Sequence, residues 1–79
     1  MTIQAEQCRA ARALLNWSQQ DLAAAAGVAR ATIAEFEGGR RTPIANNLAA
    51  MRTAFEAADV IFIEANGEGP GVRLRKKAG

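Results

Sequence analysis

The side chains that could carry chemistry in this chain suit hydrogen bonding and ion pairing, and they exclude most catalysis. The 79 residues include no His and one Cys, Cys8, so a Cys/His pair, an internal disulfide and a metal cluster are not expected. The Gly-rich segment NGEGPG, residues 66–71, precedes a predicted strand and lacks the Lys-Ser/Thr pair of a phosphate-binding loop. We therefore expect a protein that is not an enzyme and that has no cofactor.

Charges are distributed unevenly along the chain. The net charge is +2, but residues 1–70 carry six basic and eight acidic side chains, a balance of −2. The last nine residues carry Arg73, Arg75, Lys76 and Lys77 with no acid, a balance of +4. This asymmetry indicates an anionic partner, although a short basic end can also serve only to keep a protein in solution.

Length and apolar runs limit the class of protein. A chain of 79 residues forms one small domain with little room for a large enzyme cleft. Its longest apolar runs fall far short of the roughly 20 residues that cross a bilayer, and its first residues lack the apolar region of a signal peptide. We expect a soluble, cytoplasmic protein with no membrane partner.

Two helices are expected in the first part of the chain. The first begins at a Thr2 cap and stops at Asn16. Ser18 and Asp21 form a capping box that starts the second, and Gly27 ends it because glycine adopts the left-handed conformation without steric cost. The apolar residues that predict the inner face of the first helix are Cys8, Ala11, Leu14 and Leu15.

Two further helices and two strands follow. The third helix covers residues 30–37, and the fourth begins at a cap of Thr42 and Pro43, or at Asn46, and ends near residue 58. After it, β-branched and alternating residues on either side of NGEGPG predict two strands. These strands are Val60–Glu64 and Val72–Arg75.

Two short helices joined by a tight glycine-containing turn form a helix-turn-helix pattern. Residues 12–43, RALLNWSQQDLAAAAGVARATIAEFEGGRRTP, resemble the repressor/Cro-type (XRE-like) helix-turn-helix family of bacterial and phage transcription regulators, and the resemblance extends over residues 8 to about 57. The residues that carry the register are Gln19, Ala23, Gly27, Ile33 and Phe36.

The resemblance implies a mainly α fold, a compact four- to five-helix lambda-repressor-like helix-turn-helix domain over residues 1–58. Residues 59–79 would form a C-terminal two-stranded β element with a basic tail, the expected dimerisation element. The third helix would enter the major groove of double-stranded DNA. The expected function is sequence-specific transcriptional regulation, with repression by occupancy as the favoured output.

Base contacts would come from the third helix. The family places side chains on base edges at its N-terminal end, where Arg30 can reach O6 and N7 of a guanine and Ala31 a thymine methyl. Glu35 would accept from a cytosine amino group or remain a solvated helix charge. Thr32 faces the same way, toward a base edge or a neighbouring phosphate.

Phosphate contacts are expected beside the third helix. Gln19 and Gln20 begin the second helix, whose free N–H groups and partial positive charge suit a phosphate. Arg40 and Arg41 would hold further phosphates, or else form an exposed turn. The remaining expected phosphate contacts are Asn46 and Asn47.

Two positions bear on the rigidity of the third helix. Arg12 and Glu37 match an Arg and a Glu that form an internal ion pair in relatives, so the resemblance predicts that they meet. Ala29 departs from the pattern, because a Ser or Thr cap is usual there and its loss costs about 1 kcal/mol. We expect the first turn of the third helix to be frayed until Arg30 or a phosphate holds it.

Proteins of this type bind inverted repeats as homodimers, with half-sites one helical turn apart. We expect the dimer contact on the two strands, through Val60, Ile61, Phe62, Ile63, Val72 and Leu74. The alternative is a protein-interaction module, an antitoxin or anti-activator that uses the same fold to bind another regulatory protein.

Overall fold

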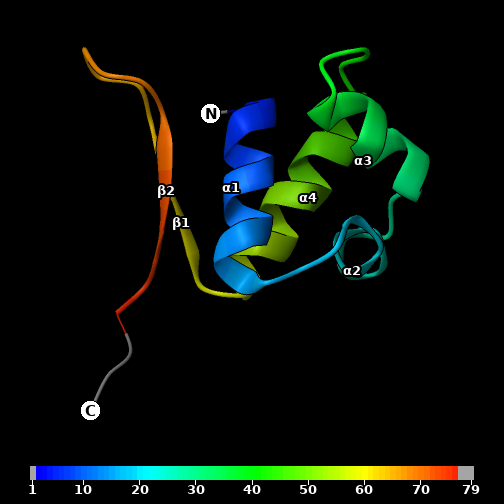
Figure 1. Ribbon diagram of the computed structural model, residues 1–79, viewed down its shortest axis with the longest axis horizontal. Coiled ribbons are helices and arrows are strands. Elements are labelled where there is room, and N and C mark those ends of the chain that lie inside the picture. Colours follow the sequence, from blue (N-terminus) through cyan, green and yellow to red (C-terminus); the bar gives the residue numbers. More distant parts are fainter. Residues whose placement is uncertain (1, 77–79) are drawn as a thin grey trace.

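The computed structural model describes residues 2–76 as four helices followed by one antiparallel hairpin (Figure 1). Met1 and residues 77–79, which include Lys77 of the predicted basic tail, lie outside the described residues. The mainly helical fold with a C-terminal two-stranded element is confirmed. The elements are α1 Ala5–Leu15, α2 Gln19–Ala26, α3 Arg30–Glu37, α4 Ala45–Ala57, β1 Val60–Ile63 and β2 Gly71–Leu74.

Local signals set the limits of α2 as predicted. The Ser18 hydroxyl accepts a hydrogen bond from the Asp21 N–H at 3.0 Å, and the Ser18 N–H donates to the Asp21 carboxylate at 2.9 Å. Gly27 ends the helix with φ of 67°, a conformation that costs glycine little. Asn16 takes a left-handed conformation, φ 59°, at the end of α1, where the stop was predicted.

The start of α1 differs from the expectation. Thr2 does not cap this helix; Gln4 is the N-cap residue. The Gln7 side chain accepts a hydrogen bond from the Gln4 N–H at 2.8 Å and so satisfies a backbone donor before the first turn. Ile3, which precedes this cap, is 2% exposed, so the segment before the helix packs onto the core.

The start of α4 also differs. Its N-cap residue is Ile44, so the helix begins neither at Thr42 and Pro43 nor at Asn46. Pro43 is buried, and the turn before α4 therefore packs against the core instead of supplying the first helical residue. The sequence indicated a helix start at two positions, and the helix begins at a third, which has no side-chain cap.

Aromatic packing joins the helices to the hairpin. Phe55 of α4 is fully buried, and its ring stacks on Trp17 at 5.8 Å between ring centroids. The same ring meets Phe62 of β1 edge-on at 5.9 Å. Trp17 is half-buried and packs against the core at the corner between α1 and α2.

One predicted core residue lies outside the core. Leu14 is 42% exposed, whereas Cys8 and Ala11 are fully buried. The buried residues of α1 also include Gln7, a polar side chain that was not among the predicted core residues. The helical spacing of apolar residues in α1 therefore did not predict correctly which side chains are buried.

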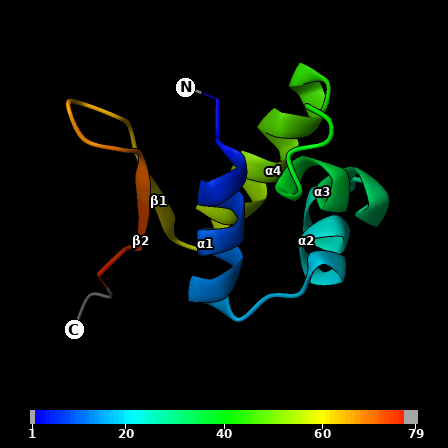
Figure 2. The same cartoon turned by 45° about the horizontal axis from the view of Figure 1, so that its top comes forward.

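The hairpin packs against α1 and α4, which lie between it and the α2–α3 pair (Figures 1 and 2). Val60 is paired with Leu74 and Ile63 with Gly71, so β1 ends one residue before Glu64 and β2 covers residues 71–74 and not 72–75. The Gln7 side chain donates to the carbonyls of Ile63 at 3.3 Å and Gly71 at 3.0 Å. This buried amide fixes the hairpin on α1.

Two of the expected dimer contacts are corrected by this packing. Val60 is 1% exposed and Phe62 8%, and both belong to the core of the chain itself. Their side chains face α1 and α4, so they are not available to a second copy. None of the helices in residues 2–76 is long and apolar enough to span a bilayer.

Candidate nucleic-acid interface

The turn between α2 and α3 is anchored on the core. Val28 is 8% exposed, and it follows the left-handed Gly27 directly. Its N–H donates to the carbonyl of Ala23 at 3.1 Å, which ties the turn to the last turn of α2. Ala23 is 5% exposed, and a small side chain there lets the two short helices approach closely.

Helix α3 lies at the edge of the molecule, with α1 and α4 between it and the hairpin (Figure 1). Ile33 is fully buried and Phe36 is 7% exposed, so these two side chains hold the helix on the core. Arg30 and Ala31 are exposed, and Thr32 and Glu35 are half-buried. The four residues predicted to contact bases therefore lie on the face that the hairpin leaves uncovered.

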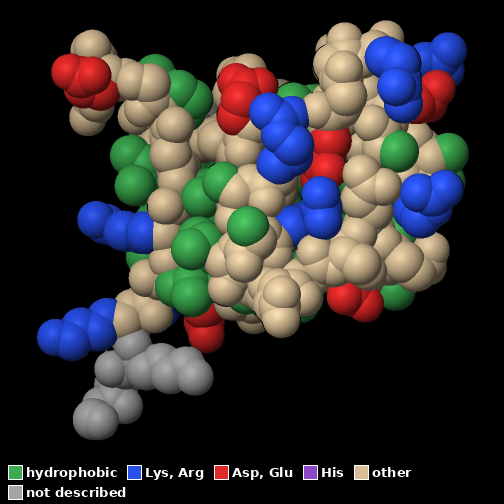
Figure 3. Space-filling model, in the orientation of Figure 1, with side chains coloured by type: hydrophobic (Ala, Val, Ile, Leu, Met, Phe, Trp, Pro, Cys, Tyr) green, Lys and Arg blue, Asp and Glu red, His purple; other side chains and the backbone are tan. Residues whose placement is uncertain are grey.

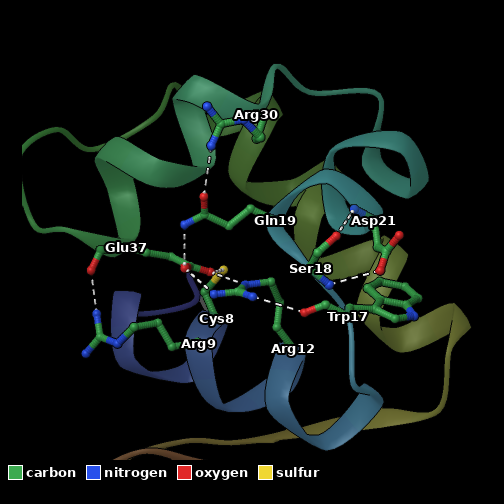
Figure 4. A network of polar contacts seen from close by, with 9 residues as sticks. All are labelled: Cys8, Arg9, Arg12, Trp17, Ser18, Gln19, Asp21, Arg30 and Glu37. Carbon is green, nitrogen blue, oxygen red and sulfur yellow. Dashed lines mark hydrogen bonds and ion pairs between the residues drawn. The ribbon is translucent and has the colours of Figure 1, made fainter.

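The end of α3 is fixed by Glu37, whose side chain is 4% exposed (Figure 4). Arg12 of α1 binds it at two points, with Nε 2.7 Å from Oε2 and a terminal guanidinium nitrogen 2.6 Å from Oε1. The predicted Arg12–Glu37 ion pair is thus present. A third Arg12 nitrogen donates to the carbonyl of Trp17 at 3.0 Å, so the same guanidinium joins α1, the α1–α2 corner and α3.

Two more residues of α1 bind Glu37. The Cys8 thiol donates to Oε2 at 3.1 Å, and Arg9 donates to the Glu37 backbone carbonyl. The sequence interpretation missed both contacts. Cys8 lies four residues before Arg12 on the same face of α1, so the resemblance that placed Arg12 against Glu37, together with this spacing, could have indicated Cys8. Arg9 binds a backbone oxygen, and a sequence pattern of side chains cannot predict such a contact.

Protonation of this cluster follows from burial and hydrogen bonding. Burial alone would raise the pKa of Glu37, but the hydrogen bonds from Arg12, Cys8 and Gln19 outweigh it and hold the pKa below its usual value. Burial, with the Glu37 carboxylate beside it, raises the pKa of the Cys8 thiol far above its ordinary value. Glu37 is therefore charged and Cys8 neutral at neutral pH.

Gln19 links this buried cluster to the exposed end of α3 (Figure 4). Its side-chain nitrogen donates to Glu37 Oε1 at 3.1 Å, and its oxygen accepts from the Arg30 guanidinium at 3.3 Å. Because the first contact sets which way the amide points, the oxygen is presented to Arg30. The Arg30 guanidinium is thus held at the surface by a side chain that is itself held from inside.

The loop after α3 carries two more exposed basic side chains, Arg40 and Arg41. The backbone N–H groups of Arg40 and Arg41 both donate to the Glu35 carbonyl, at 2.9 and 3.3 Å, and both side chains are exposed. Figure 3 shows basic side chains over α3 and this loop, and others beside the hairpin. Gln20 and Asn46 are also exposed, and the remaining polar residues of the predicted set, Gln19 and Asn47, are half-buried.

Comparison with known proteins agrees with this geometry. A family model described as Helix-turn-helix matches residues 9–56, more than half of the chain. The chain therefore belongs to the XRE-type helix-turn-helix family, and it is a DNA-binding helix-turn-helix regulator. A search of curated proteins found no significant match to the chain.

Proposed function

We propose that this regulator is a sequence-specific repressor that binds an inverted-repeat operator as a homodimer, with α3 of each copy in the major groove. In this proposal the protein acts in the cytoplasm and represses by occupying the operator. The observation that carries the proposal is the support of exposed Arg30 by Gln19, which is bound in turn to buried Glu37.

Base reading in this proposal starts from Arg30. An Arg fork that keeps one hydrogen bond to Gln19 has donors left for O6 and N7 of a guanine. Ala31 is exposed next to it and suits a thymine methyl. Thr32 in the same turn and Glu35 in the next turn are half-buried. Glu35 accepts from a cytosine amino group if the base pair lies against that turn.

Phosphate binding surrounds this helix on two sides. Gln19 and Gln20 form the first turn of α2, where unpaired N–H groups favour an anion. Exposed Arg40 and Arg41 follow α3, and Asn46 and Asn47 lie in the first turn of α4. Such contacts fix the position of the protein on the duplex and make the affinity depend on salt.

The homodimer rests on the surface of the hairpin that its own chain leaves open. With Val60 and Phe62 excluded by burial, the remaining candidates are Ile61, Ile63, Val72 and Leu74. Leu74 is 45% exposed and the other three are half-buried. Two copies are needed because one recognition helix covers only part of one major-groove turn.

A footprint or a genome-wide binding map with purified protein tests the proposal. The expected result is a protected inverted repeat whose halves are one helical turn apart. A protein that forms a stable complex with another protein, protects no DNA and keeps that complex after Arg30→Ala is instead the interaction module considered above. That result would overturn the repressor proposal.

A further inference from the structure

The outer edge of β2 is open along its length. Figures 1 and 2 show no helix or strand of the described chain on the side of β2 away from β1. Arg73, Leu74 and Arg75 are exposed there, and Val72 is half-buried. A bare edge of this kind carries backbone groups that another strand can bind.

The pattern of pairing shows which backbone groups face that edge. The Arg75 N–H donates to the Asp59 carbonyl at 2.7 Å, and the register places Val60 opposite Leu74. In an antiparallel ladder, directly bonded pairs alternate with pairs whose N–H and C=O groups point away. The groups of Val72 and Leu74 therefore point outward from β2.

We propose that β2 pairs antiparallel with β2 of a second copy, so that two hairpins form one four-stranded sheet. This inference rests on the homodimer of the proposed function and names its interface. When β2 pairs with β2 of a second copy, the two copies are related by a two-fold axis and the assembly stops at two. When β1 pairs with a second copy's β2, each copy keeps one free strand edge, and further copies can add to it. A closed dimer follows only from the symmetric arrangement.

Charge selects the register of this pairing. If the axis passes through Arg73, the two Arg73 side chains lie directly opposite each other, which is unfavourable. If it passes through Val72, Arg73 faces Gly71 of the other copy and Arg75 faces Gly69. The sheet then has no pair of like charges directly opposed, so this register is the one we propose.

The same register matches the ends of the hairpin. It places Lys76 at the level of Glu68 of the second copy, and both side chains are exposed in the single chain. It also brings Leu74, 45% exposed, against Pro70 of the second copy. The basic end of each chain thus lies beside the acidic turn of the other, and an exposed apolar side chain is covered.

Leu74→Pro tests the pairing, with Leu74→Val as its matched control. The proline lacks the N–H that would donate to the second copy's Pro70 carbonyl, while its own hairpin does not use that N–H. Sedimentation equilibrium of the full chain at about 10 to 200 μM should give a dimer for wild type and Leu74→Val, and dimerisation about tenfold weaker for Leu74→Pro. A monomeric wild type, or an unchanged Leu74→Pro dimer, overturns the interface.

Charge reversal tests the register and does not depend on the proline variant folding. Glu68→Lys and Lys76→Glu should each weaken dimerisation about threefold, and the double variant should restore it to near the wild-type value. A double variant no stronger than the single ones overturns the register. Arg30→Ala should leave the dimer unchanged. A wild-type protein that dimerises but protects no DNA counts against the proposed function alone.

Discussion

Arg12 and Glu37, 25 residues apart in the sequence, form a two-point ion pair with nitrogen–oxygen distances of 2.6 and 2.7 Å. The Glu37 side chain is 4% exposed and that of Arg12 is 20% exposed, so the carboxylate depends on the guanidinium for most of its compensation. This pair fixes the end of α3 on α1. Its removal would leave a charged group buried without its principal partner.

Arg12→Ala is expected to lower the free energy of unfolding by about 3 kcal/mol, because it leaves the buried Glu37 carboxylate without a charged side-chain partner. Urea denaturation monitored by circular dichroism measures the change. Glu56→Gln, which removes only the exposed Arg52–Glu56 pair at 3.1 Å, should cost less than about 1 kcal/mol. Equal costs for the two variants would mean that the Arg12–Glu37 pair has no special structural role.

Stability should depend on pH through Glu37. Its pKa is lowered in the folded protein, so its contribution is complete above its unfolded pKa of about 4.3 and is lost as the pH falls through the lower folded value. Urea midpoints measured from pH 7 to pH 3 should therefore fall more steeply for wild type than for Glu37→Gln below about pH 4.3. Parallel curves for the two proteins would contradict the lowered pKa.

Ala29 offers a test of the start of α3. It is the N-cap residue and makes no side-chain cap, although its backbone is extended with φ −63° and ψ 139°. Ala29→Ser supplies a hydroxyl that can accept from the Thr32 N–H and should stabilise the protein by about 1 kcal/mol. Ala24→Ser, at an exposed position within α2, should instead destabilise it by about 0.5 kcal/mol. If Ala29→Ser and Ala24→Ser changed the free energy of unfolding equally, helix capping would not explain the effect of Ala29→Ser.

Gln19→Ala should weaken specific DNA binding more than Gln20→Ala. Both side chains lie in the first turn of α2, but only Gln19 bonds to Glu37 and Arg30. Glu37 keeps its other partners, so the free energy of unfolding should change by about 1 kcal/mol or less. Fluorescence anisotropy with the protected duplex measures the affinities. A larger loss for Gln20→Ala would show that positioning of Arg30 is unimportant.

Features set by neighbouring residues could be predicted from the sequence. The Ser18–Asp21 capping box and the left-handed Gly27 are local, and they gave the limits of α2 correctly. The pattern of small and apolar residues around them carried the family resemblance. The predicted start of α4 was wrong because the N-cap residue is Ile44, which has no polar side chain to mark it, and the preceding Pro43 is buried.

Features set by tertiary contacts could not be predicted in the same way. The sequence marked β1 as apolar on both faces, and only packing shows that Val60 and Phe62 face the core. Gln7 reaches carbonyls 56 and 64 residues away, and no local pattern distinguishes it from a surface glutamine. The link from Gln19 to Arg30 likewise requires the crossing of α2 and α3.

The affinity of Arg30 variants for the protected duplex tests the central claim most directly. Arg30→Ala should weaken specific binding by about 1–3 kcal/mol and relax the preference at one base pair, with the free energy of unfolding unchanged. Arg30→Lys keeps the charge but not the two-point fork, so it should restore little of the specificity. If Arg30→Ala discriminates between the protected duplex and a scrambled one as well as wild type does, α3 does not read DNA through Arg30.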